Sequence, residues 1–237
     1  LNKKEPVLGF IWDGTGYGDD GNIWGGEFFE YRDNRVSRRG HYQYFDHILG
    51  DKMAKEPRVS ALALCQSIPD AEKLLKSKFT VVEWRIYKKI LTNKNKLKTS
   101  SIGRLFDAVA SLLGLLDTSS FEGQGGMLLE KCAVAGFQAK ENDLVPAYYN
   151  AGAGNYTIDI NALIEDINSG LKKETIAAQF HLSLVALIRS VAQQSGIKNL
   201  AFSGGVFQNS LLIGLIINDL KYDYNLHFHN QFSPNDE

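Results

Sequence analysis

Two glycine-rich segments combine the residue types that bind phosphate groups and metal ions. The first, "WDGTGYGDDGN", places Asp13 directly after an apolar run, where a carboxylate can hold a cation near phosphates. The second, "FSGGVFQN", joins another apolar run to an expected helix, so Gly204 and Gly205 permit close backbone approach at a positive helix end. Neither has the Lys-Ser/Thr pair of a P-loop, and the first lacks the residue order of an EF-hand. Phosphate-binding turns and tight structural turns both fit this pattern.

Other acidic residues have plain structural interpretations. Asp107 lies three residues after Arg104 in an expected helix, and this spacing predicts a helical ion pair. Asp19, Asp20 and Glu27 are expected to be solvated turn and hairpin residues.

The histidines and cysteines show no arrangement typical of a catalytic triad or a zinc site. His227 and His229 share one strand face, but packing or surface positions are the commoner use of such a pair. His181 is expected to be a packing residue with its hydrogen bonds satisfied. Cys65 and Cys132 are expected to be buried free thiols in a reducing compartment.

The elements that must position these residues alternate in type along the chain. Apolar periodicity and turn residues predict strands at 6–12, 156–160, 199–203 and 224–232, and a hairpin that begins at residue 23. The same signals predict helices at 56–68, 81–92, 101–114, 127–137, 161–169, 173–195 and 210–220. Two strand–glycine-turn units therefore frame a set of helices, which favours an α/β chain with two sheet-bearing lobes and a cleft between them.

Composition narrows the class of protein. The chain has 237 residues, 44% hydrophobic and 22% charged, with 26 basic and 27 acidic residues. This balance gives no global field that favours nucleic acid or a membrane surface. A signal peptide and a run of about 18 apolar residues are both missing, so we expect a soluble, cytoplasmic location. The chain starts at Leu1 and ends on "SPNDE", and we interpret it as a piece of a longer polypeptide.

Four blocks, in order, resemble the hydrogenase maturation carbamoyltransferase family (HypF): "DGTGYGDDGNIWGGEF", "SSIGRLFDAVASLLGL", "EGQGGMLLE" and "SGGVFQN". The similarity spans most of the chain and covers the C-terminal, Kae1-like domain of that family. It implies an α/β fold of the actin, hexokinase and sugar-kinase (ASKHA) group, with two RNase H-like lobes around an interlobe nucleotide cleft. Residues 1–237 would be a partial domain, with roughly 1–100 a remnant of the first lobe and 101–237 the second lobe.

The resemblance also implies a reaction. Upstream acylphosphatase, zinc-finger and adenylating domains would convert carbamoyl phosphate and ATP to carbamoyl-adenylate. The Kae1-like domain would then pass the carbamoyl group to the C-terminal cysteine thiol of a partner protein, HypE. That product leads to the cyanide ligands of the nickel–iron hydrogenase active site.

Site residues follow from the resemblance position by position. Asp13 and Asp236 match carboxylate ligands of a divalent metal in the cleft, iron or zinc, with Mg²⁺ as a further possibility. The nucleotide-binding positions are Asp107, Gly126, Glu130, Gly204, Gly205 and Asn209. No catalytic base is assigned in this chain.

The chain departs from the family pattern in three places. Two metal-binding histidines of the family precede the position of Leu1, Glu237 stands where glycine is usual, and the tryptophan that commonly precedes Arg58 is missing. Two other interpretations stay open. One is a related threonylcarbamoyl- or O-carbamoyl-transferase domain. The other is a nucleotide- or partner-binding fragment that is inactive by itself.

Overall fold

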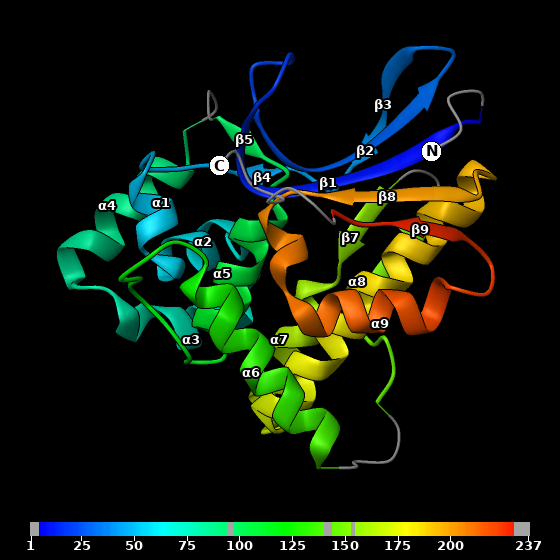
Figure 1. Ribbon diagram of the computed structural model, residues 1–237. Helices are drawn as coiled ribbons and strands as arrows, with labels where there is room; N and C mark the ends of the chain where they lie inside the picture. Colours follow the sequence, from blue (N-terminus) through cyan, green and yellow to red (C-terminus); the bar gives the residue numbers. More distant parts are fainter. Residues whose placement is uncertain (1–4, 94–96, 140–143, 153–154, 230–237) are drawn as a thin grey trace.

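The computed structural model describes residues 5–93, 97–139, 144–152 and 155–229, in which a mixed seven-stranded sheet lies against a layer of helices (Figure 1). The strand order is β4-β5-β2-β1-β8-β9, and β3 also pairs with β2. The strands of this sheet are β1 (Val7–Tyr17), β2 (Ile23–Arg32), β3 (Arg35–His41), β4 (Phe45–Asp46), β5 (Lys98–Thr99), β8 (Asn199–Ser203) and β9 (Asn225–His227). A separate two-stranded sheet contains β6 (Tyr149–Gly152) and β7 (Asn155–Ile158).

The strands that carry the two glycine segments, β1 and β8, belong to the same sheet. β1 pairs in parallel with β8, with Phe10 opposite Phe202, although nearly the whole chain separates the two strands. The expectation of two sheet-bearing lobes is therefore wrong for the described residues: strands from 1–100 and from 101–237 belong to one sheet. Parallel pairing of distant strands leaves no local signal in the sequence, because each strand only shows that it is buried.

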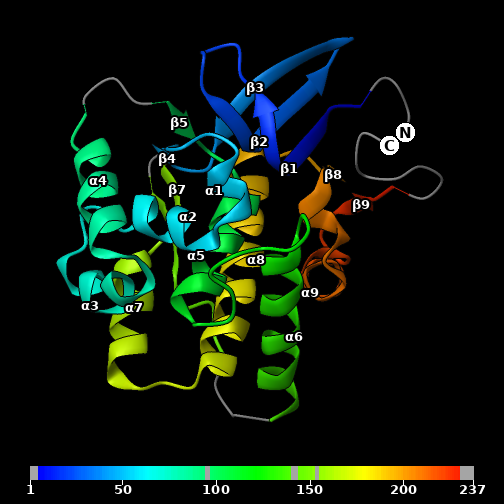
Figure 2. The ribbon, with the colours of Figure 1, turned by 90° about the vertical axis from the view of Figure 1, so that its left-hand side faces the viewer.

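The helices lie on one side of the seven-stranded sheet, as two views at right angles show (Figures 1 and 2). They are α1 (Lys52–Lys55), α2 (Pro57–Leu64), α3 (Glu72–Leu75), α4 (Val81–Leu91), α5 (Ile102–Leu112), α6 (Gln124–Gln138), α7 (Ile160–Ser169), α8 (Lys173–Ser195) and α9 (Ser210–Leu220). Three short 3₁₀ segments are η1 (Pro69–Ala71), η2 (Lys76–Lys78) and η3 (Gly205–Gln208).

From Leu8 to Trp12, every second residue of β1 is apolar and buried, so one face of the sheet packs against the helices. Leu8, Phe10 and Trp12 of β1 are fully buried, and the Phe10 ring stacks on Phe202 with centroids 5.3 Å apart. α8 is the one helix in the described part of the chain that is long and apolar enough to cross a membrane. Of its most apolar 18-residue stretch, 72% is buried inside the protein. Burial of this extent is typical of the core helix of a globular domain.

Most of the expected elements are present with shifted ends. β1 continues through the first glycine segment to Tyr17, because residues beyond a register shift pair with β2. α6 starts at Gln124 rather than at Met127, since Gly125 and Gly126 form its first turn. The expected closing strand is short, and its predicted last residues, 230–232, lie outside the described residues.

Candidate nucleotide-binding pocket

A pocket of about 770 Å³ opens where four segments of the chain meet. Its walls come from the glycine segment of β1, the first turns of α5, the start of α6, and the turn between β8 and α9. Six of the predicted site residues line it: Asp13, Asp107, Gly126, Glu130, Gly205 and Asn209.

Asp13 lies at an irregularity inside β1, where the register with β2 shifts between Trp12 and Gly16. The sequence predicted it at a strand end, so the acid is placed by a bulge, a device that redirects side chains beside many sites. Its Oδ1 accepts a hydrogen bond from the Gly14 amide at 2.7 Å. Its carbonyl oxygen accepts one from Ser101 Oγ at 2.8 Å, which ties β1 to the start of α5. Asp13 is thus held in place by these two hydrogen bonds at the wall of the pocket.

Asp107 is a buried acid on α5. The ion pair expected from the sequence is present, with Arg104 Nη2 3.1 Å from Asp107 Oδ2. α6 approaches so closely that a Cβ added at Gly125 would lie 2.5 Å from Asp107 Oδ1. Burial raises the pKa of Asp107 to about 6, against the lowering effect of Arg104, and the nearby charge of Glu122 adds to the rise. When ionised, a buried carboxylate of this kind is a strong hydrogen-bond acceptor for a ligand hydroxyl.

Glu130 and Asn209 meet at the start of α9. Glu130 Oε1 accepts hydrogen bonds from Ser210 Oγ at 2.6 Å and from the Leu211 amide at 2.9 Å. Asn209 caps the same helix through its Oδ1, which accepts from the Leu212 amide at 2.8 Å. The carboxylate and the cap satisfy amides that a helix start leaves unpaired, so the turn after β8 is firmly held.

His181 supports Asn209 from behind. Its Nδ1 contacts the Ala177 carbonyl at 2.8 Å, and its Nε2 lies 3.2 Å from Asn209 Nδ2. These partners assign the proton to Nδ1, so that Nε2 accepts from the amide. Burial lowers the pKa of His181 to about 4, which keeps the ring neutral. The expectation that His181 is a packing residue with satisfied hydrogen bonds is confirmed, and the structure adds that it orients a residue of the pocket.

Gly204 lies beside the pocket and is not one of its lining residues. Its φ of +102° belongs to glycine, and a Cβ there would collide with the Trp12 carbonyl oxygen. The residue therefore lets the β8 turn lie close against β1. Asp236 lies outside the described residues.

The described residues supply one carboxylate of the expected metal pair. Across residues 5–93, 97–139, 144–152 and 155–229, no three His, Cys, Asp or Glu side chains gather closely enough to hold a metal ion. His227 and His229 form no such group with neighbours, and Cys65 and Cys132 are buried free thiols, as expected. Asp13 alone does not select a metal, although its oxygen donors suit a hard cation such as Mg²⁺.

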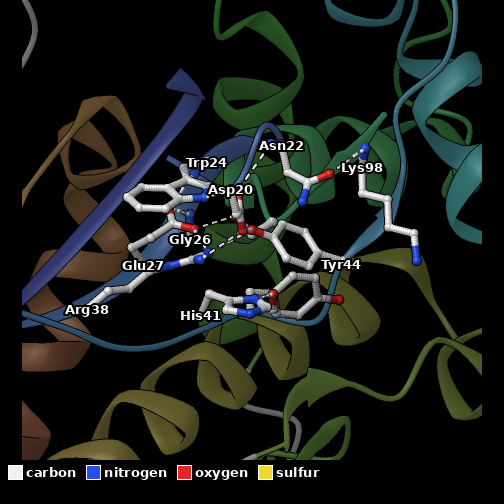
Figure 3. Close-up of polar contacts among 12 residues, drawn as sticks. Asp20, Asn22, Trp24, Gly26, Glu27, Arg38, His41, Tyr44 and Lys98 are labelled. Atoms are coloured by element: carbon white, nitrogen blue, oxygen red, sulfur yellow. Dashed lines mark hydrogen bonds and ion pairs between the residues drawn. The ribbon is translucent and has the colours of Figure 1, made fainter. Parts of the chain in front are cut away.

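A polar network around Glu27 and Asp20 braces the glycine segment (Figure 3). Glu27 is only 2% exposed and accepts hydrogen bonds from the amides of Gly25 and Gly26, from Ser100 Oγ, and from Arg38 Nη2. Asp20 accepts hydrogen bonds from Asn22, Trp24, Arg38 and Tyr44, and the Arg38 guanidinium lies 4.0 Å from the Trp24 ring centroid.

The expectation that Glu27 is solvated is therefore wrong, whereas Asp19 and Asp20 are exposed turn residues as expected. Two partners of Glu27 are distant in the sequence, Arg38 on β3 and Ser100 before α5, so the residues around Glu27 gave no sign of its burial. The network reaches the pocket through Gly25, where a Cβ would lie 2.5 Å from the Asp13 carbonyl oxygen.

Sequence reasoning missed several lining residues, including Thr15, Glu122 and Gln208, and gave Arg104 only a structural role. One usable signal was the concentration of glycines in all four wall segments. At Gly103, for example, a Cβ would lie 2.9 Å from the Gly14 Cα, so two walls meet without side chains.

Comparison with known proteins gives a consistent family. The family model described as "Carbamoyltransferase, Kae1-like Domain, second subdomain" matches residues 9–237. Carbamoyltransferase HypF of Synechocystis is 37% identical over 240 residues, which cover 92% of this chain and 31% of the relative. Carbamoyltransferase HypF2 of Cupriavidus necator is 30% identical over 239 residues, 89% of this chain and 29% of the relative. The chain thus spans about a third of the length of these relatives.

Solved structures agree with the sequence matches. A full-length HypF in a phosphate- and nucleotide-bound form superposes with a TM-score of 0.85 at 29% identity, over 98% of this chain and 32% of that one. HypF of T. kodakarensis has the same fold, with a TM-score of 0.80 at 23% identity over 97% of this chain and 32% of that one. Together with the α/β architecture and the glycine-lined pocket, these matches show that the chain belongs to the HypF carbamoyltransferase family, as the second subdomain of its Kae1-like domain.

Proposed function

We propose that this chain is part of a carbamoyl-transfer domain whose pocket binds an adenylate. The observation that carries the proposal is the meeting of six expected site residues, from four separate segments, around one pocket. Two helix starts and several glycines give backbone amides access to a phosphate there, and the acids can accept hydroxyl groups of a sugar. The nucleotide-bound form of the full-length relative supports the same ligand class.

In this proposal the donor is carbamoyl-adenylate, made from carbamoyl phosphate and ATP by other domains of the longer, cytoplasmic protein. The acceptor is the C-terminal cysteine of HypE, and the product serves cyanide ligand synthesis. The pocket would form one wall of the interlobe cleft of an ASKHA-type fold, with the facing lobe supplied by residues outside this chain. A divalent metal, when bound between Asp13 and Asp236, would neutralise phosphate charge.

The chemistry asked of this chain is positioning. A thiolate sulfur attacks the carbamoyl carbon, the carbon–oxygen bond to phosphate breaks, and the bonding electron pair leaves with AMP. Asp107 and Glu130 would hold the nucleoside while the amides of the glycine turns hold the phosphate. No side chain of this chain is assigned as a base, because a cysteine thiol reaches its thiolate form near neutral pH with modest help.

Replacing Asp13 by alanine in the full-length protein is expected to abolish carbamoyl transfer and to leave adenylation by the upstream domains intact. The assay mixes the protein with its thiol partner, ATP and labelled carbamoyl phosphate, and measures label on the partner's terminal cysteine. Asp236→Ala should have the same effect.

Asp19→Ala is the matched control, because Asp19 lies on the same segment and is exposed. It should transfer like the wild type. Normal transfer by Asp13→Ala would contradict the metal assignment, and unlabelled partner with wild-type protein would contradict the proposed function. The isolated chain, tested in the same way, shows whether it is a binding fragment that needs the rest of the protein.

A further inference from the structure

Arg104 is a buried cation in the wall of the pocket. Its side chain is 6% exposed, and its ion pair within the described part of the chain is the one with Asp107, at 3.1 Å. Nε and Nη1 have no hydrogen-bond partner among the described residues. A buried guanidinium with unmade hydrogen bonds is costly, so such groups are rare unless a ligand completes them.

Other arginines of this protein show how a structural guanidinium is held. Arg58 uses Nε, Nη1 and Nη2 in hydrogen bonds to Glu56, to the Lys78 carbonyl oxygen and to Glu83. Arg189 likewise binds Asp219 and Asp223 with all three nitrogens. Arg104 is more deeply buried than either, yet its environment is less complete.

Arg104 is one of the residues that line the pocket. Nη2, the nitrogen that pairs with Asp107, borders the space that Gly14 leaves beside the pocket: a Cβ added at Gly14 would lie 3.4 Å from Nη2 and 3.7 Å from Glu122 Oε1. The start of α6 borders the same pocket at Gly123 and Gly126, and no side chain caps this helix start. A buried cation and an uncapped helix N-terminus therefore face one space, and both favour negative charge.

Arg104 is surrounded in the pocket by residues of the opposite charge. The other ionisable lining residues are acids, namely Asp13, Asp107, Glu122 and Glu130. Acids suit the hydroxyl groups of a nucleoside and repel its phosphate. Arg104 is the one lining side chain, within the described part of the chain, that offsets this repulsion.

We propose that Arg104 binds the phosphate group of the adenylate and so selects nucleotides over nucleosides. This assignment rests on the proposed function of the pocket and extends it. In this arrangement Asp107 accepts a sugar hydroxyl, and Arg104, its ion-pair partner, donates to a phosphate oxygen. One buried pair thereby reads the two chemically different ends of a nucleoside monophosphate.

The test is calorimetric titration of the whole chain with AMP and with adenosine, which differ only in the phosphate. Arg104→Gln is expected to weaken AMP binding about 10- to 100-fold and to weaken adenosine binding by a clearly smaller factor, which arises from the loss of the ion-pair partner of Asp107. Arg104→Lys keeps the charge on a single donor group and should fall between the wild type and Arg104→Gln. Arg58→Gln removes a structural arginine outside the pocket and should leave the ratio of the two affinities unchanged.

Equal losses for AMP and adenosine in Arg104→Gln would overturn the assignment, because they indicate a structural role, and so would no loss for AMP. If Arg104→Gln does not fold, Gly14→Ala tests the same space, since its methyl group would fill the region in front of Nη2. Gly14→Ala should weaken the binding of AMP more than the binding of adenosine. Equal losses of affinity for the two compounds would overturn the assignment. If the wild type binds neither compound, the proposed function itself fails and the assignment fails with it.

Discussion

Replacing Asp107 by asparagine is expected to stabilise the protein at pH 8 and to weaken nucleotide binding at the same time. Burial raises the pKa of Asp107 from its ordinary 3.8 to about 6 in the folded protein. The unfolded chain therefore loses this proton first as the pH rises. The contribution of Asp107 to the free energy of unfolding is therefore fully present below pH 3.8 and is lost as the pH rises through about 6. At pH 8 the difference amounts to about 3 kcal/mol of unfolding free energy.

Asparagine has nearly the same shape and no charge, so Asp107→Asn avoids this loss. Urea unfolding at pH 8 and at pH 4 measures the effect. The variant should exceed the wild type by up to about 3 kcal/mol at pH 8 and match it near pH 4. Its affinity for AMP should fall about 10-fold or more, because a charged acceptor is lost. Asp219→Asn is the control: this acid pairs with Arg189 at the surface, so its removal should cost under about 1 kcal/mol.

A variant that is less stable than the wild type at pH 8 would contradict this account of Asp107. Unchanged AMP binding would contradict its role as a ligand. Buried acids that lower stability and serve binding are typical of functional sites. The rest of the fold supplies the stability that such a site costs.

Replacing Glu27 by leucine is expected to lower the free energy of unfolding by about 3–5 kcal/mol. The carboxylate accepts hydrogen bonds from two amides, one serine and one arginine while only 2% exposed. Leucine has a similar size and accepts none of them, so four donors lose their common partner. Because the same contacts hold Gly25 against Asp13, AMP affinity should fall as well.

Urea unfolding with fluorescence detection gives the free energy directly. Glu30→Gln is the matched control on the same strand, because its arginine partners, Arg32 and Arg39, are 57% and 62% exposed. It should change the free energy by less than about 1 kcal/mol. A loss this small in Glu27→Leu would show that the network does not hold the glycine segment in place.

The elements of the fold were largely predictable, and the way they join was not. The helix α8, for example, follows from apolar periodicity and turn residues that act within a few residues. The pairing of β1 with β8 depends on contacts across nearly the whole chain, and the two-sheet expectation failed there. The bulge that places Asp13 inside β1 is likewise set by its partner strand.

The same distinction applies to the site. Asp13, Asp107 and Glu130 came from a resemblance that matched four blocks, and the structure places all three around one pocket. The buried state of Glu27 could not be read from the sequence, because its partners lie on β3 and before α5. The spacing of Arg104 and Asp107 fits both a buried ion pair in a binding site and an exposed ion pair on a helix surface. Burial alone separates these two interpretations.

The central claim, that this pocket is an adenylate site, is tested most directly by an NMR titration of the chain with AMP. The account predicts saturable changes in amide signals at Gly14, Gly126 and Gly205, which belong to three different walls of the pocket. Changes confined to a distant part of the surface, or no saturable change at millimolar AMP, would contradict it.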